Sequence, residues 1–159
     1  MIFYEPKALY RAFREEVPEA EETMPIGKAQ IMREGKDLTM VSYGAMMRPT
    51  LEAASELNAK DGVEAEVIDL LTISPLDDGT FVQSVLKTGR CVVIHEAPRS
   101  FGPGAEIVSR LMEKAFYYLE VPIERVTGYD IIMPLFSREK AYLPNAQRIL
   151  RAARKALSD

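Results

Sequence analysis

Short apolar runs alternate with amphipathic stretches along most of this sequence. The clearest run is Cys91-Val92-Val93-Ile94, which is too short for a helix and rich in β-branched residues, so it predicts a buried strand. A polar loop with glycine and proline is predicted from His95 to Gly104, and a helix after it. The inward stripe of this helix is predicted to comprise Ile107, Val108, Leu111, Met112 and Ala115. A strand, a loop and a covering helix make the repeating unit of an α/β sheet.

The same alternation begins near residue 28 and continues to the end of the chain. Further strands are predicted at residues 29–33, 38–43, 65–71 and 122–126. Further helices are predicted after Gly44, after the cap Ser74-Pro75-Leu76-Asp77 and from Asn145. Their apolar stripes are, in chain order, Leu51, Ala54 and Leu57; Phe81, Val82, Val85 and Leu86; and Ala146, Ile149, Leu150, Ala153 and Leu157.

The order of these elements predicts the fold class. The first two strands are separated by Glu34-Gly35-Lys36-Asp37, whose glycine suits a tight hairpin, so one strand at an edge is expected to be antiparallel. The later strands alternate with helices, which implies parallel pairing with helices on both faces. The predicted fold is therefore an α/β protein, a three-layer α/β/α sandwich with a mostly parallel five-stranded sheet and one antiparallel edge strand.

The first 27 residues do not follow this pattern. Ile2-Phe3-Tyr4 is predicted to be the remnant of a strand, ended by Glu5-Pro6. The acidic run at residues 15–22 is interpreted as a solvated linker, with a docking site for a basic partner as the alternative. We therefore predict that residues 1–27 are the end of a preceding domain and a linker, and that residues 28–159 form the α/β domain. A chain that starts in this way is expected to come from a larger protein.

Composition narrows the classes of function. The 159 residues accommodate one ordinary domain, and the net charge of −4 without a compact basic patch argues against nucleic acid as a partner. The longest apolar runs fall short of the ~20 residues of a membrane span, and the N-terminus lacks the pattern of a signal peptide. The single cysteine, Cys91, excludes an internal disulfide and suits the cytoplasm. The chain also has only one histidine, so one chain cannot form a closed Cys/His zinc site.

The candidate chemistry lies in the loop after Ile94. His95 beside Glu96 could be a general acid/base pair, although a lone histidine at a strand end is more often hydrogen-bonded within a loop or interface. Arg99 could bind a carboxylate or phosphate, or form a surface ion pair. Gly102-Pro103-Gly104 could present backbone N–H groups to an anion, but it also suits a simple strand-to-helix turn, which we favour. These residues support binding and assembly better than catalysis.

Five segments resemble one family in the same order along the chain. They are IFYEPKALYR, EVIDLLTISPLDD, KTGRCVVIHEAPRSFGPGAEI, ERVTGYD and EKAYLPNAQRIL. Together they resemble the β subunit of 2-oxoacid dehydrogenase complexes, the thiamin-diphosphate-dependent decarboxylating component that acts on pyruvate or branched-chain 2-oxoacids. The resemblance covers nearly the whole chain but only the carboxyl-terminal half of that subunit. It implies the fold of a transketolase carboxyl-terminal domain, with IFYEP as the end of the preceding pyrimidine-binding domain.

The resemblance implies an assembly role. In the family, thiamin diphosphate and Mg²⁺ lie between the α subunit and the amino-terminal half of β. This chain is therefore expected to have no catalytic residue and to bind no cofactor or metal itself. It is expected to pack against a second β subunit, to contact the α subunit, and to help dock the peripheral-subunit-binding domain of the lipoyl acyltransferase. The residues expected at a subunit interface or at the approach to the active site are His95, Glu96, Arg99, Phe101, Gly102 and Gly104.

The competing hypotheses make different structural predictions. The assembly domain predicts exposed apolar or aromatic surface around the loop at His95 and around the terminal helix. The alternative is a self-standing small-ligand or anion-binding module using Arg99 and residues 102–104, which predicts a preformed pocket at the carboxyl edge of the sheet. A third hypothesis is an independent enzyme that uses His95 and Glu96. Pro103 stands where related chains are richer in glycine, which affects the shape of this loop.

Overall fold

The structure is a computed structural model that describes residues 2–14, 16, 19 and 23–158. Its centre is a five-stranded sheet with the strand order β1-β3-β2-β4-β5. The strands are β1 (Gln30–Arg33), β2 (Leu38–Ser42), β3 (Ala65–Asp69), β4 (Cys91–Pro98) and β5 (Glu124–Gly128). The α-helices are α1 (Met47–Asp61), α2 (Asp78–Thr88), α3 (Pro103–Ala115), α4 (Phe136–Tyr142) and α5 (Ala146–Ser158), and the 3-10 turns are η1 (Lys7–Leu9), η2 (Gly44–Met46) and η3 (Phe116–Tyr118).

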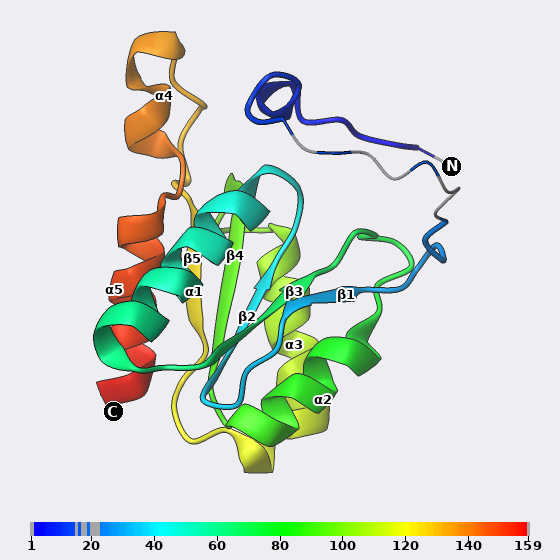
Figure 1. Cartoon of the computed structure of the whole chain (residues 1–159), viewed down its shortest axis with the longest axis vertical. Helices are drawn as coiled ribbons and strands as arrows, with labels where there is room; N and C mark the ends of the chain where they lie inside the picture. Colours follow the sequence, from blue (N-terminus) through cyan, green and yellow to red (C-terminus); the bar gives the residue numbers. More distant parts are fainter. Residues whose placement is uncertain (1, 15, 17–18, 20–22, 159) are drawn as a thin grey trace.

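Helices cover both faces of the sheet (Figure 1), so the predicted three-layer sandwich is confirmed. One core lies under α1 and α5 and the other lies under α2 and α3. The first contains Met40, Leu57, Val92, Ile94 and Ile149; the second contains Val41, Phe81, Cys91, Val93 and Leu111. Successive residues of β4 alternate between these two cores, as the pleat of a strand buried on both faces requires. In the described part of the chain, no helix is long and apolar enough to cross a membrane.

The predicted hairpin between β1 and β2 is wrong. β3 lies between these strands, antiparallel to β1 and parallel to β2. The connecting residues 34–37 instead cross the start of β3, where the N–H groups of Lys36 and Asp37 donate to the carbonyl of Glu64 over 2.9 and 3.1 Å. A Cβ on Gly35 would lie closer than 3.0 Å to the backbone of β3, so this glycine permits a close approach of two chain segments. The antiparallel edge strand itself is confirmed.

Three local predictions also differ from the structure. Residues 2–6 form no strand, and the side chains of Ile2, Phe3 and Tyr4 are exposed. β4 continues to Pro98, so His95 belongs to a strand and not to a loop. Met112 of α3 is exposed, and α4 had no predicted counterpart. Of the acidic run interpreted as a linker, residues 15, 17–18 and 20–22 lie outside the described residues.

Candidate functional site

His95 lies inside the protein, with no exposed surface. The first turn of α3 covers its imidazole, and the Gly104 N–H donates a hydrogen bond to Nε2 over 3.2 Å. A Cβ on Gly104 would lie 2.8 Å from the ring Cδ2, and one on Gly102 would lie 2.9 Å from Cε1. Close packing on the imidazole therefore requires Gly104, whereas Gly102 is confined by the Pro98 carbonyl as well as by the ring. The structure brings these three predicted residues together as a packed and hydrogen-bonded unit. This agrees with a hydrogen-bonded histidine and with a simple strand-to-helix turn at residues 102–104.

The start of α3 offers no open cradle for an anion. The Gly104 N–H is bonded to His95, the Ala105 N–H donates to the carbonyl of Gly102 over 3.0 Å, and Pro103 has no N–H. Anion binding at a helix N-terminus depends on N–H groups that are free to point at the ligand. The geometry therefore gives the anion-binding hypothesis no support at these residues.

His95 and Glu96 point to opposite faces of the sheet. His95 packs under α3, whereas the Glu96 carboxyl lies on the side of α4. Desolvation and then the negative charge of Glu139 in α4 raise the pKa of Glu96. Neighbouring residues of a strand alternate in direction, so the sequence pair does not become a spatial pair. The acid/base hypothesis therefore lacks the contact that it requires.

The single histidine of the chain makes stability dependent on pH. Because Nε2 accepts the Gly104 N–H, the neutral ring carries its proton on Nδ1, and a second proton would have to enter at Nε2 against that donor. Burial and, to a smaller extent, the charge of Arg125 lower the pKa of His95, against a raising contribution from the backbone at Ala97. The unfolded chain therefore binds a proton more readily than the folded chain below the ordinary histidine pKa.

We expect the free energy of unfolding to decrease as the pH falls below about 6.5, by up to about 1.4 kcal/mol per pH unit. Urea unfolding of the wild type and of His95→Gln, measured between about pH 5 and 8, isolates this contribution from that of the carboxyl groups. The wild type should lose more stability than the variant on acidification. Parallel curves for the two proteins would contradict the expected contribution of the imidazole.

The loop that follows β4 is fixed to the end of β5. The backbone N–H and the hydroxyl of Ser100 each donate to the carboxylate of Asp130 over 2.8 Å, and these bonds lower the pKa of Asp130. Arg99 and Arg125 each donate a guanidinium N–H to the other's backbone carbonyl, over 3.1 and 3.3 Å. Arg99 is therefore used in holding the loop. The same loop presents Phe101, which is fully exposed and has a left-handed backbone with φ of 57°.

Exposed apolar side chains occur in this loop and in the segment that follows β5, to which Asp130 ties the loop. We call them the carboxyl-edge surface, and they are Phe101, Tyr129, Ile131, Ile132, Leu135 and Phe136. The prediction of apolar surface around the loop near His95 is therefore confirmed. It is wrong for the terminal helix, because the apolar stripe of α5 is buried against the sheet. Sequence reasoning missed residues 131–136, although an apolar run that fits neither strand nor helix periodicity was a usable signal.

A hollow of about 230 Å³ lies beside Phe101, between the loop after β3 and the start of α3. Its lining includes Leu70, Ile73, Leu76, Phe101, Glu106 and Ile107. The carboxyl edge of the sheet thus carries a concavity, as the ligand-binding hypothesis predicts. Among the described residues, its lining contains no basic side chain, and its charged residue is the acidic Glu106, so the concavity offers no cation to an anionic ligand. The sequence analysis placed Leu76 in the cap of a predicted helix and assigned no role to Ile73, so neither residue was expected at a hollow.

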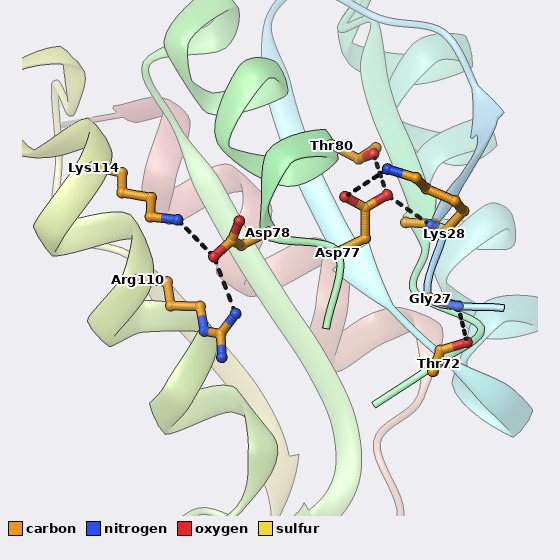
Figure 2. Close-up of polar contacts among 9 residues, drawn as sticks. Gly27, Lys28, Thr72, Asp77, Asp78, Thr80, Arg110 and Lys114 are labelled. Atoms are coloured by element: carbon orange, nitrogen blue, oxygen red, sulfur yellow. Dashed lines mark hydrogen bonds and ion pairs between the residues drawn. The ribbon is translucent and has the colours of Figure 1, made fainter. Parts of the chain in front are cut away.

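Polar contacts fix the loop that forms one wall of the hollow (Figure 2). Thr72 accepts a hydrogen bond from the Gly27 N–H over 3.2 Å. Asp77 accepts bonds from the Ala29 N–H over 3.0 Å and from the Thr80 hydroxyl over 2.9 Å. Although burial acts to raise the pKa of Asp77, these donors hold it below its usual value. The segment before α2 is thereby tied to the residues that lead into β1.

An ion-pair cluster joins this wall to the opposite one (Figure 2). The Asp78 carboxylate contacts Lys114 over 2.7 Å and Arg110 over 3.0 Å, and both cations lie on α3. The hydrogen bond from Lys114 is the main cause that lowers the pKa of Asp78. The start of α2 and the body of α3 are therefore joined by ion pairs.

The described residues do not fit the cofactor that the resemblance implies for the whole subunit. No group of three or more His, Cys, Asp or Glu side chains in this part of the chain could hold a metal ion. The N–H groups at the start of α3 that could bind a diphosphate are already bonded. Burial raises the pKa of the Cys91 thiol to about 12, so this residue is a neutral core side chain and not a nucleophile.

Comparisons with known proteins agree on one family. The family described as "Transketolase, C-terminal domain" matches residues 27–149. The chain is 46% identical over 157 residues to the pyruvate dehydrogenase E1 component subunit beta of Bacillus subtilis and 48% identical to that of Staphylococcus aureus. Each match covers 99% of this chain and 48% of the relative, so the chain spans about half the length of the curated relatives that it matches.

Solved structures show the same fold. A chain described as "Split gene transketolase, inactive beta4 tetramer" superposes with a TM-score of 0.76 at 29% identity, covering 91% of this chain and 46% of the other. A 2-oxoglutarate:ferredoxin oxidoreductase from Magnetococcus marinus superposes with a TM-score of 0.55 at 8% identity, over 82% of this chain and 19% of the other. The second similarity concerns the fold alone.

Proposed function

The chain belongs to the family of transketolase carboxyl-terminal domains, and from this membership we propose that it is the assembly and docking part of a 2-oxoacid dehydrogenase β subunit, inactive by itself. The observation that carries the proposal is the carboxyl-edge surface, a set of exposed apolar side chains that lie outside both buried cores. Patches of this kind mark interaction sites, because exposed Ile and Phe side chains gain free energy when a partner covers them.

The parent reaction is proposed to be the oxidative decarboxylation of a 2-oxoacid with acyl transfer to a lipoyl group. Pyruvate is the favoured substrate class, because the relatives with 46% and 48% identity are pyruvate dehydrogenase subunits. A branched-chain 2-oxoacid is the alternative. Thiamin diphosphate and Mg²⁺ would be held outside this chain, in keeping with the poor fit of the residues described above.

Three partners are proposed for the domain: a second β subunit, the α subunit and the peripheral-subunit-binding domain of the lipoyl acyltransferase. Self-association is supported by the similar chain whose description is a β4 tetramer. The predicted interface residues Arg99 and Phe101 lie in the fixed loop at this surface, whereas His95, Gly102 and Gly104 support that loop from within. The exposed Glu96 lies at the same end of β4.

Sedimentation velocity tests the proposal. The chain is measured alone, with the cognate α subunit, and with the acyltransferase binding domain. We expect a dimer or a complex with one of these partners, and we expect Ile132→Asp to weaken it at least tenfold, because a charge would be buried in an apolar contact. Ala59→Asp places the same charge on an exposed position of α1 and is the control. A chain that stays monomeric and binds neither partner would exclude the assembly function.

The ligand-binding alternative rests on the hollow beside Phe101. Its lining favours an uncharged apolar ligand, because most of its side chains are apolar and its charged side chain, Glu106, is paired with Arg110 over 2.8 Å. The anion-binding version has no observation in its favour. The assembly proposal is preferred because the hollow is continuous with exposed apolar side chains, which a small ligand would leave uncovered.

A further inference from the structure

A projecting side chain and an apolar hollow lie next to each other at the carboxyl edge of the sheet. Phe101 is fully exposed and borders the hollow of about 230 Å³ that Leu70, Ile73 and Leu76 help to line. An apolar cavity of roughly 150 Å³ is large enough to hold benzene. The hollow therefore has room for one phenyl ring, and a fully exposed phenyl ring is present on the same face of the same chain.

Both features are preorganised. Phe101 has a φ of 57°, and its loop is held by the Ser100–Asp130 hydrogen bonds. On the other side of the hollow, Leu71 has a φ of 55° and its N–H donates to the Asp69 carboxylate over 3.1 Å. Left-handed backbone at bulky residues is uncommon and concentrates where the surrounding structure fixes a functional conformation. Rigid groups lose little entropy on association, which favours their use in an interface.

The arrangement is self-complementary. In a two-fold dimer each copy must offer the same patch, so a projection and a recess on one face can each receive the other. The acidic group in the lining, Glu106, is already paired with Arg110 over 2.8 Å, so the hollow does not require a cationic ligand. The apolar residues Ile131 and Ile132 follow Asp130, which is bonded to the Phe101 loop, and extend the area that a second copy could cover.

We propose that Phe101 of one copy inserts into the hollow of a second copy, at the wall formed by Ile73 and Leu76, and that the reciprocal insertion closes a two-fold dimer. This inference rests on the proposed self-association and assigns it to a particular contact. The occupant is the aromatic ring of a second copy of this chain, and not a small ligand or a helix of another protein.

A double-mutant cycle in the dimer dissociation constant tests the contact. Phe101→Ala and Ile73→Ala are each expected to weaken dimerisation roughly 30-fold or more, the range of interface hot spots. The double variant should be little weaker than the worse single variant, because each substitution removes the same ring-to-wall contact. Tyr117→Ala, which truncates an exposed aromatic side chain at the far end of α3, is the matched control and should leave the dimer unchanged. At a protein concentration low enough for every protein to be monomeric, all four should keep the wild-type midpoint of thermal unfolding, since the altered side chains are exposed.

The outcomes separate this inference from the proposed function. A dimer that persists in Phe101→Ala, or effects of Phe101→Ala and Ile73→Ala that simply add, would overturn the inference and leave the assembly function in place. A wild-type chain that is monomeric alone but binds the α subunit would do the same. A loss of dimer in both single variants, with no further loss in the double variant, supports the reciprocal insertion.

Discussion

Gly104→Ala is expected to lower the free energy of unfolding by about 1–3 kcal/mol, the range for overpacking at a buried site. The added methyl group would lie 2.8 Å from Cδ2 of His95 and 3.4 Å from Cγ1 of Val93. Neither neighbour can move freely, because His95 has no exposed surface and Val93 lies in the core between the sheet and α3. Urea unfolding followed by circular dichroism at a pH above 7 measures the change without protonation of the imidazole.

Two further variants show whether the imidazole causes the cost. His95→Ala removes the ring that the methyl group would meet, so His95→Ala/Gly104→Ala should be destabilised by less than the sum of the two single changes. Gly79→Ala in the first turn of α2 is the control, because the nearest atom to its new Cβ is Asp77 Oδ1 at an ordinary 3.5 Å. That variant should gain up to about 1 kcal/mol from helix propensity. Strict additivity of the double variant would show that the strain lies elsewhere.

The layers of the fold followed from local patterns, but the strand order did not. Alternating apolar runs and amphipathic stretches were enough for four parallel strands and the helices on both faces. The turn signal at residues 34–37 was real, yet a glycine reports only that the chain bends or approaches another segment closely. Its role depends on Glu64, which lies outside any local window and accepts the N–H groups of Lys36 and Asp37. Pairing between distant strands is decided by such contacts, and a single sequence does not display them.

The candidate site could likewise be predicted only in part from the sequence. The residues from His95 to Gly104 were recognised as a unit, but their polar and small side chains suggested exposure, and the imidazole is instead enclosed by two glycines. Burial of a polar ring becomes favourable only through a partner such as the Gly104 N–H, which comes from the next element. The full exposure of Phe101 was not predicted, because the presence of an aromatic residue in a loop does not indicate whether its side chain is buried or exposed. Its left-handed backbone is a property of the folded loop alone.

Lys87→Met is the second large expected effect, a loss of about 2–3 kcal/mol at neutral pH. The Lys87 ammonium is paired with the carboxylate of Glu66, a β3 residue that is 1% exposed. Burial acts to raise the pKa of Glu66, but the hydrogen bond from Lys87, followed by that from Ser84, holds the pKa below its usual value. Without Lys87 the buried carboxylate keeps weaker donors, among them the Gly35 N–H at 3.4 Å. The expected loss is below that of a fully buried pair because Lys87 is half-exposed.

The pH dependence of the stability loss in Lys87→Met shows whether the unpaired Glu66 carboxylate causes it. In the wild type the folded pKa of Glu66 is lowered, so its contribution to stability is present above the unfolded pKa and is lost as the pH falls through the folded value. In Lys87→Met burial prevails and the folded pKa rises, so the deficit relative to the wild type should shrink on acidification from about pH 7.5 to 5. Lys87→Met/Glu66→Gln removes the unpaired charge and should recover most of the loss at neutral pH.

A surface ion pair supplies the matched comparison. Lys60→Met breaks the contact of 2.8 Å between Lys60 and Glu56 on the outer face of α1, and it should cost no more than about 0.5 kcal/mol at any pH in this range. The same chemical change at two lysines therefore separates the attraction of an ion pair from the penalty of an uncompensated buried charge. If Lys87→Met and Lys60→Met proved equally mild, the Glu66 carboxylate would be reached by water, and its pairing would contribute little to the stability of the sheet.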